Sequence, residues 1–220
     1  MKHQLLHLAS LAIIVTFIGC KSAVIYDTPN SLRNINGTLH LTNGKSVDGK
    51  LIINTDYAIG TPIKVYAPGE KEPMKFSLYD VKGYEMRGSY YALKQVHGGL
   101  QLGNNFSFMK RLTPENSRIH LYENIDKRIN RNVNNMSTTS YDYEYYLQMP
   151  NETGDDVWRL SSSKFTPNFD EKMSLLLSDC PTLARKIADK QEGYFYRQVS
   201  FTERRADVLL NIISEYNKCR

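Results

Sequence analysis

Few residues of this sequence are spaced for catalysis, and the histidines are the first to consider. His40 and His120 each stand between apolar residues in an alternating pattern, which places them on the polar side of predicted strands. His97 precedes Gly98-Gly99, and a His-Gly-Gly run can form the oxyanion hole of an esterase. That chemistry also needs a nucleophile elbow, and Gly-x-Ser-x-Gly does not occur in the sequence. A turn is therefore the favoured interpretation of residues 97–99, and an unrecognised hydrolase is the less favoured alternative.

Motifs for metals and cofactors are also missing from the sequence. There is no His-Glu-x-x-His, no Cys-x-x-Cys, no phosphate-binding glycine loop and no dinucleotide fingerprint. Glu152, Asp155 and Asp156 could contact calcium, but their spacing matches no calcium loop, which favours a charged turn. We therefore expect no cofactor, no metal site and no enzymatic activity.

The first 20 residues have the composition of an export signal. A short basic start over residues 1–4 is followed by an apolar stretch over residues 5–18, which is too short to span a bilayer. The ending Phe17-Ile18-Gly19-Cys20 resembles the lipobox of bacterial lipoproteins, although leucine is usual where Phe17 stands. The resemblance implies a signal peptide over residues 1–19 and lipid attachment at Cys20. An ordinary secretory peptide or a buried helix with an incidental cysteine are the alternatives.

The net charge of the chain and the residue after Cys20 indicate where the protein is located and what it can bind. Lys21 resembles the outer-membrane class of lipoproteins, so we expect a lipid-anchored protein at the outer membrane, facing the periplasm. Lys2 is the only charged residue before Cys20, so its removal lowers the net charge from +5 to +4. An exported protein seldom meets nucleic acid, which leaves anionic lipid head groups, acidic glycans or other envelope proteins as partners. A solvated surface is the plainer interpretation of the charge.

Two cysteines are left once Cys20 is assigned to lipid. Cys180 and Cys219 form an even pair in an oxidising compartment, so we predict a disulfide between them. Such a bond would close a loop of about 40 residues and contribute roughly 4 kcal/mol in the chain-entropy model. Two unpaired buried thiols are the alternative.

The spacing of apolar residues predicts a strand-rich part that follows a tether. Residues 20–34 carry turn residues and little periodicity, which indicates a tether. Alternating apolar and polar residues then predict hairpins over residues 39–53, 63–78, 84–96 and 106–122. Residues 129–140 show no period and are predicted to form a loop, before strands return at 141–149 and 157–160. We predict an antiparallel β-rich roll or small barrel over residues 35–165.

The last 55 residues have a helical period. Phe169, Met173, Leu177 and Cys180 recur on one face of a predicted helix, and Pro181 suits the first turn of a second. A capping box at residues 200–203 indicates the start of a third helix. The predicted fold class is therefore α+β, with a three-helix segment over residues 166–220 packed on the β-rich part.

Three short C-terminal segments resemble those of a known group of proteins. They are Ser-Ser-Ser-Lys-Phe at 161–165, Leu-Ser-Asp-Cys-Pro at 177–181 and Ile-Ser-Glu-Tyr-Asn-Lys-Cys at 213–219. These segments resemble uncharacterised envelope proteins of Bacteroides-type bacteria, which join a strand-rich part to a short helical tail with two cysteines. The resemblance implies a similar origin, the disulfide and the α+β architecture, and it implies no activity.

The best candidate for binding is the tyrosine-rich segment at residues 141–146. On a strand, Tyr141, Tyr143 and Tyr145 share one face. Tyrosine rings suit contact with glycans or proteins, although packing within the sheet is the plainer interpretation. We therefore expect a non-enzymatic envelope lipoprotein that acts as an interaction or accessory module, with a glycan- or lipid-binding module as the alternative.

Overall fold

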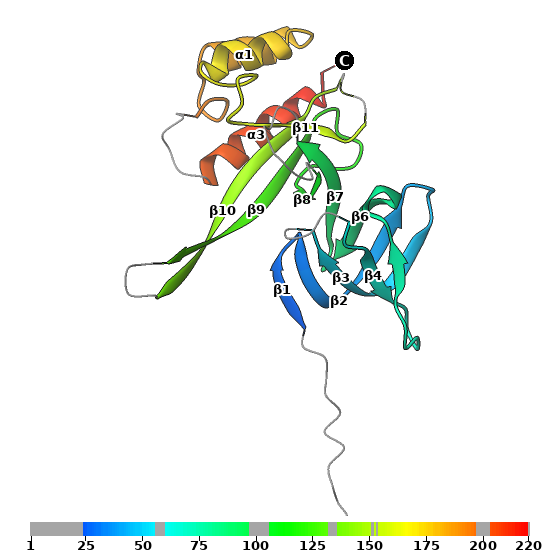
Figure 1. Ribbon diagram of the computed structural model, residues 1–220. Helices are drawn as coiled ribbons and strands as arrows, with labels where there is room; N and C mark the ends of the chain where they lie inside the picture. Colours follow the sequence, from blue (N-terminus) through cyan, green and yellow to red (C-terminus); the bar gives the residue numbers. More distant parts are fainter. Residues whose placement is uncertain are drawn as a thin grey trace, which may run out of the picture.

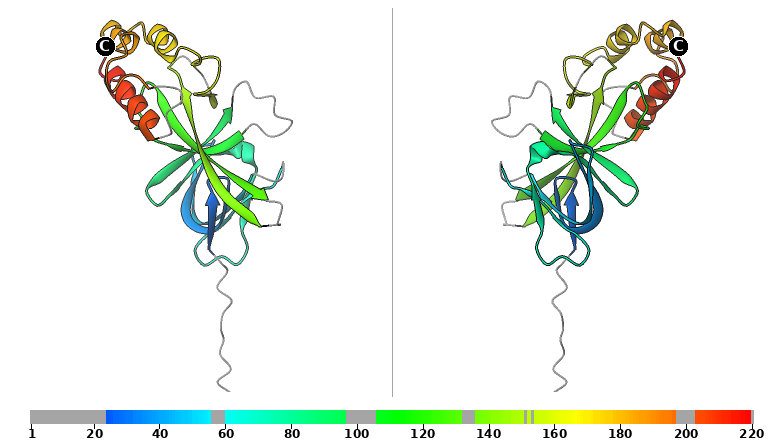
Figure 2. Two further views of the ribbon diagram at one scale, coloured as in Figure 1. Left: turned by 90° about the vertical axis from the view of Figure 1, so that its left-hand side faces the viewer. Right: turned by 90° about the vertical axis from the view of Figure 1, so that its right-hand side faces the viewer.

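The computed structural model describes residues 24–55, 60–96, 106–131, 136–150, 152, 154–196 and 203–219. An eleven-stranded sheet forms the body, and three α-helices lie at the end opposite to β1 (Figures 1 and 2). The α+β fold, with a β-rich part and a helical tail, is thereby confirmed. The predicted signal peptide and Cys20 lie outside the described residues, as does the run that contains His97.

The sheet has the strand order β11-β10-β9-β8-β7-β6-β2-β3-β4-β5, with β1 paired to β2. The described elements are β1 (Ile25–Thr28), β2 (Ser31–Leu41), β3 (Ser46–Asn54), β4 (Ile63–Tyr66), β5 (Met74–Phe76), the 3-10 helix η1 (Leu78–Asp80), β6 (Val81–Met86), β7 (Ser89–Val96), β8 (Phe106–Arg111), β9 (His120–Arg131), β10 (Ser137–Gln148), β11 (Asp156–Arg159), α1 (Phe169–Leu176), α2 (Pro181–Ala188) and α3 (Glu203–Tyr216).

Strands β1 to β8 curl around one apolar core, and we call this part the N-terminal roll. The four predicted hairpins all form, because each alternating pattern sends its apolar residues to the same side. The fully buried residues of this core include Leu39, Leu51, Val65, Tyr84 and Phe108. Tyr84 stacks on Tyr91 with ring centroids 4.8 Å apart, which adds a specific aromatic contact to the burial of apolar area.

Two glycines permit the close packing of this roll. Gly37 of β2 is paired with Gly49 of β3. A Cβ atom on Gly37 would lie under 3.0 Å from the carbonyl oxygen of Glu85, and one on Gly49 would be equally close to the carbonyl oxygen of Tyr66. No side chain fits there, so the approach of β2 to β6 and of β3 to β4 depends on glycine.

Strand β11 closes a second, smaller structure, which we call the five-stranded ring. It pairs antiparallel with β10 through Tyr146 and Arg159, and parallel with β7 through Val96 and Val157. Because β7, β8, β9 and β10 pair in sequence, β11 completes a closed ring. A separate buried cluster fills it, comprising Ala92, Met109, Tyr122, Tyr146 and Val157.

The three helices cover the outer face of β9 and β10. The predicted helices form, and Pro181 begins α2. Phe169 and Met173 of α1 are buried in one cluster with Leu121 of β9 and Leu147 of β10. The helical segment is therefore packed on the strands through a shared apolar core.

A disulfide joins the turn between α1 and α2 to the C-terminal end of α3. The predicted bond between Cys180 and Cys219 is present, with their Cα atoms 5.9 Å apart. Arg118, which precedes β9, binds the same region: its guanidinium donates to the carbonyl oxygen of Cys219 at 3.1 Å and to Asp179 at 2.7 Å. It also lies 3.9 Å from the ring centroid of Tyr216. The last helix is thus fixed both covalently and by charge.

The prediction that residues 20–34 form a tether is wrong from Ile25 onward. Residues 25–28 form β1, and β2 begins at Ser31. The two strands pair antiparallel. The turn between them lies inside the roll: Pro29 accepts a hydrogen bond from the Tyr84 hydroxyl at 2.9 Å, and Asn30 is only 4% exposed. Long-range contacts therefore order a segment that has no periodicity of its own.

Asn30 connects three parts of the N-terminal roll. Its side-chain oxygen accepts from the backbone N–H of Phe108 at 2.8 Å and from the hydroxyl of Thr55 at 3.0 Å. Its amide nitrogen donates to the hydroxyl of Ser107 at 2.8 Å. Because a buried amide needs partners for both its groups, this residue fixes the first turn against β8 and the end of β3.

The loop predicted over residues 129–140 is also corrected. Strand β9 continues to Arg131 and β10 begins at Ser137, so most of that segment is a paired ribbon. Asparagine and serine disfavour strands, but continuous pairing with the neighbouring strand overrides this local preference.

Replacement of Asn30 tests the role of the first turn. Asn30→Ala leaves the buried N–H of Phe108 without its acceptor, so we expect a loss of roughly 2–3 kcal/mol in the free energy of unfolding, measured in urea. Asn54→Ala removes an exposed amide at the end of β3 and should change stability by less than about 0.5 kcal/mol. Equal effects of the two substitutions would contradict the assignment.

Loss of the disulfide should destabilise the whole protein. The free energy of unfolding of the double variant Cys180→Ser/Cys219→Ser is expected to be up to about 4 kcal/mol lower than that of the unaltered protein. The control is the unaltered protein after reduction, which should unfold like the double variant. Reaction of the native, unreduced protein with a thiol reagent at these cysteines would show that the bond is absent.

Candidate functional site

The three candidate tyrosines of β10 differ in their exposure to solvent. Tyr141 and Tyr143 are 44% and 47% exposed, whereas Tyr145 is partly buried against the helical core. All three lie on the same face of the strand, as its alternation requires. Since the helices cover only the end of β10 that follows residue 144, two of the three rings are left accessible.

Those two rings belong to a two-stranded ribbon that we call the arm, comprising residues 124–131 of β9 and 137–144 of β10. Within the described residues, β8 pairs with β9 only at Tyr122 and Glu123, and β11 pairs with β10 only at Tyr146 and Leu147. Beyond these pairs the ribbon extends away from the body of the sheet (Figure 1). Its described part also exposes Ile129 at 54%.

Asp27 of β1 joins the arm to the N-terminal roll. Its carboxylate accepts from the Tyr141 hydroxyl at 2.8 Å and forms an ion pair with Lys127 at 2.6 Å. Burial alone would raise the pKa of Asp27, but the hydrogen bonds from Lys127 and Tyr141 outweigh it and hold that pKa below its ordinary value of 3.8. The middle of the arm is therefore fixed to the first strand.

A small hollow lies where the arm meets the helices. It has a volume of ≈ 170 Å³ and is lined by Tyr143, Tyr145, Leu160 and Arg205, among others. The exposed ring of Tyr143 thus borders a recess of the size of one side chain.

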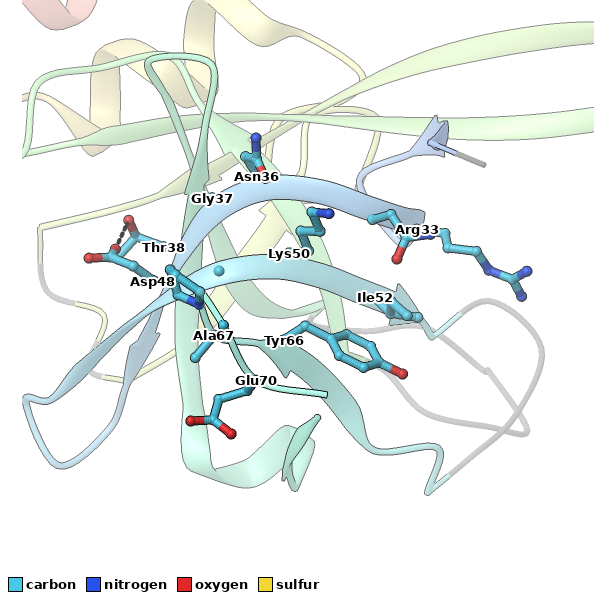
Figure 3. Close-up of a pocket in the computed structure, with 14 residues that line it drawn as sticks. Arg33, Asn36, Gly37, Thr38, Asp48, Lys50, Ile52, Tyr66, Ala67 and Glu70 are labelled. Carbon is cyan, nitrogen blue, oxygen red and sulfur yellow. Dashed lines mark hydrogen bonds between the residues drawn. The ribbon is translucent and has the colours of Figure 1, made fainter. Parts of the chain in front are cut away.

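A much larger groove lies on the outer face of β2, β3 and β4, with a volume of ≈ 980 Å³ (Figure 3). This volume is at the upper end of the roughly 300–1,000 Å³ that ligand sites occupy. Its lining includes two cations, Arg33 and Lys50, beside the ring of Tyr66. At the other side of the groove, the Thr38 hydroxyl donates to Asp48 at 2.6 Å.

The cations of this face extend beyond the groove. Arg33 is paired with Ile52, Ile52 with Lys64, and Lys64 with Lys75, so these side chains form one row across four strands. Lys50 lies in the next row, between Asn36 and Tyr66. Within the described residues, none of these four cations takes part in an ion pair. The groove face can therefore attract an anion and offer an aromatic surface beside it.

Sequence reasoning missed this face. In the sequence, each lysine has the place of an ordinary polar residue in an alternating strand. The available signal was the regular recurrence of cations at outward positions of successive hairpins. Only the register shows that Lys64 and Lys75 are direct neighbours.

A buried lysine lies near the end of the five-stranded ring. Lys94 is 8% exposed, and its amine donates to Gln148 at 3.2 Å and lies 3.4 Å from Asp155. Burial lowers the pKa of Lys94, and the charge of Asp155 opposes that effect. Tyr122 donates to the same oxygen of Gln148 at 3.1 Å. These contacts satisfy the buried amine and stabilise the ring.

Two further properties concern the described part of the chain only. No group of three or more His, Cys, Asp or Glu residues there could hold a metal ion. None of its helices combines the length and the apolar character that crossing a membrane requires.

Comparison with models of protein families, with curated proteins and with solved structures gives no match. Functional inference therefore starts from the arm and the groove face themselves.

The contact of Asp27 with the arm should be pH-dependent. Because its folded pKa is depressed, its contribution to stability is present above pH 3.8 and is lost as pH falls through the lower, folded pKa. We expect Asp27→Asn to cost about 1 kcal/mol in the free energy of unfolding near pH 5, with the difference shrinking towards pH 3. Asp80→Asn, at an exposed carboxylate, should change the free energy of unfolding by less than about 0.5 kcal/mol near pH 5. A difference for Asp27→Asn that stays constant with pH would contradict the assignment.

Proposed function

We propose that this protein is a lipid-anchored, non-enzymatic module of the bacterial cell envelope that binds a partner protein through its arm. The observation that carries the proposal is the ribbon with two exposed tyrosines, Tyr141 and Tyr143, beside a recess at its base. Exposed tyrosines bordering a small recess are typical of protein contact sites.

The edge of β10 suits the addition of a strand. Within the described residues, the outer edge of β10 pairs with β11 at Tyr146 and Leu147, and the carbonyl oxygen of Tyr145 accepts from the backbone N–H of Leu160 at 2.9 Å. Before Tyr145, no described strand pairs with this edge over residues 137–144, so an extended segment of another protein can add there. A side chain of such a segment would reach the recess lined by Tyr143 and Leu160.

The anchor part of the proposal rests on the sequence. The apolar stretch over residues 5–18 and the ending at Cys20 support lipid attachment, and Lys21 supports a place at the outer membrane, facing the periplasm. Two or three acyl chains hold a protein stably on a membrane, whereas one does not. A partner in the same envelope would then meet the arm at high local concentration.

Membrane fractionation and crosslinking together test this proposal. A photoreactive residue in place of Tyr143 should give one discrete adduct with an envelope protein in cells, and Tyr141→Ala should reduce its yield several-fold. The matched control is the same photoreactive residue at Ser140, on the opposite face of the same strand. Cys20→Ser should remove the protein from the membrane fraction. Equal adduct yields from positions 143 and 140 would contradict binding through the arm. An unchanged membrane fraction for Cys20→Ser would contradict the lipid anchor.

A further inference from the structure

We infer that the outer face of β1 to β5 docks onto the anionic phospholipid surface to which the protein is anchored. We call this the cationic face and define it by Arg33, Lys50, Lys64 and Lys75, with Ile25 and Tyr66 beside them. The inference rests on the proposed lipid at Cys20 and identifies a second, non-covalent contact with the same membrane.

The register places four members of this face in one row and Lys50 and Tyr66 in the next. Ile25 of β1 is paired with Arg33, and the row continues through Ile52 and Lys64 to Lys75 on the last strand. Directly paired residues of neighbouring strands point to the same side of a sheet. Figure 3 shows Arg33, Lys50 and Tyr66 on adjacent strands around the groove. One face therefore presents cations over four consecutive strands, β2 to β5, with Ile25 of β1 beside them.

This arrangement of charge is costly unless an anion offsets it. Lys64 and Lys75 stand directly opposite each other, and like charges in that position repel. Within the described residues, neither these two lysines nor Arg33 nor Lys50 is in an ion pair, although acidic residues occur nearby at Asp48 and Glu70. An anionic surface would offset the repulsion along the whole row, which a single small anion would not.

The short tether brings this face close to the membrane. Only four residues lie between Cys20 and Ile25, and these five residue steps span at most about 18 Å when fully extended. The row starts at Ile25, which is paired with Arg33, so the short tether keeps this first cation near the head groups. A tether of 14 residues would have allowed the domain to lie well away from the lipid.

The apolar residues at the start of the row fit the same surface. Val24 and Ile25 are 67% and 47% exposed and lie next to the point where the anchor segment joins β1. Apolar side chains flanked by cations suit the boundary between head groups and acyl chains. The helices lie at the opposite end of the molecule and would point away from the membrane (Figure 2).

The test measures lysine reactivity in the full-length, lipidated protein. The protein is placed in vesicles of phosphatidylcholine alone or of phosphatidylcholine mixed with phosphatidylglycerol, and acetylation of each lysine is followed by mass spectrometry. In the mixed vesicles we expect acetylation of Lys50, Lys64 and Lys75 to be at least about threefold slower than in phosphatidylcholine alone. High salt should restore the faster rate. Lys218, at the helical end, serves as the control and should not change.

A charge variant and a competing ligand make the test specific. Lys64→Gln/Lys75→Gln should abolish the protection of Lys50, and Lys218→Gln should leave it intact. Protection by added polygalacturonate but not by phosphatidylglycerol would make the face a site for acidic glycans and would overturn the inference.

The mass of the N-terminal peptide from the same samples separates the possible failures. Lipid on Cys20 together with unprotected lysines would overturn the docking face and leave the anchor intact. Absence of lipid on Cys20 would overturn both, because the argument from the short tether would no longer apply.

Discussion

The buried amide of Asn30 is the contact on which the arrangement of this protein depends. It fixes the turn between β1 and β2 to the backbone of Phe108 and to Thr55. Without these bonds the first strand would be held by its pairing with β2, by the two contacts of Asp27 with the arm and by the hydrogen bond from Tyr84 to Pro29. A buried polar network is specific because each member requires its partners, so this turn has one position rather than many.

The position of β1 sets the geometry of both proposed surfaces. On one side, Ile25 extends the row of cations and determines how near that row lies to the lipid. On the other, Asp27 binds Lys127 and Tyr141 in the middle of the arm. A single short strand thereby relates the membrane-facing surface to the ribbon that we propose binds a partner. The disulfide and Arg118 have the corresponding role at the helical end, where they fix α3.

Local sequence was enough to predict the elements whose stability is local. Alternation located the hairpin of β2 and β3, and the helical period of Phe169 and Met173 located α1. The cysteine count led to the disulfide. Strand β1, the length of the arm and the parallel pairing of β11 with β7 could not be predicted, because each depends on contacts between residues far apart in the chain. The cationic face was missed for the same reason: its residues are unremarkable singly, and only the register brings them together.

The most direct test of this account is amide hydrogen exchange over the first strand. In the intact protein, the peptide covering residues 24–30 should exchange as slowly as the following one from β2, because both belong to one sheet and share the buried turn at Asn30. Asn30→Ala should accelerate the first peptide more than the second. Exchange of residues 24–30 at the rate of an unstructured peptide in the unaltered protein would contradict the account, since the segment would then be a flexible tether.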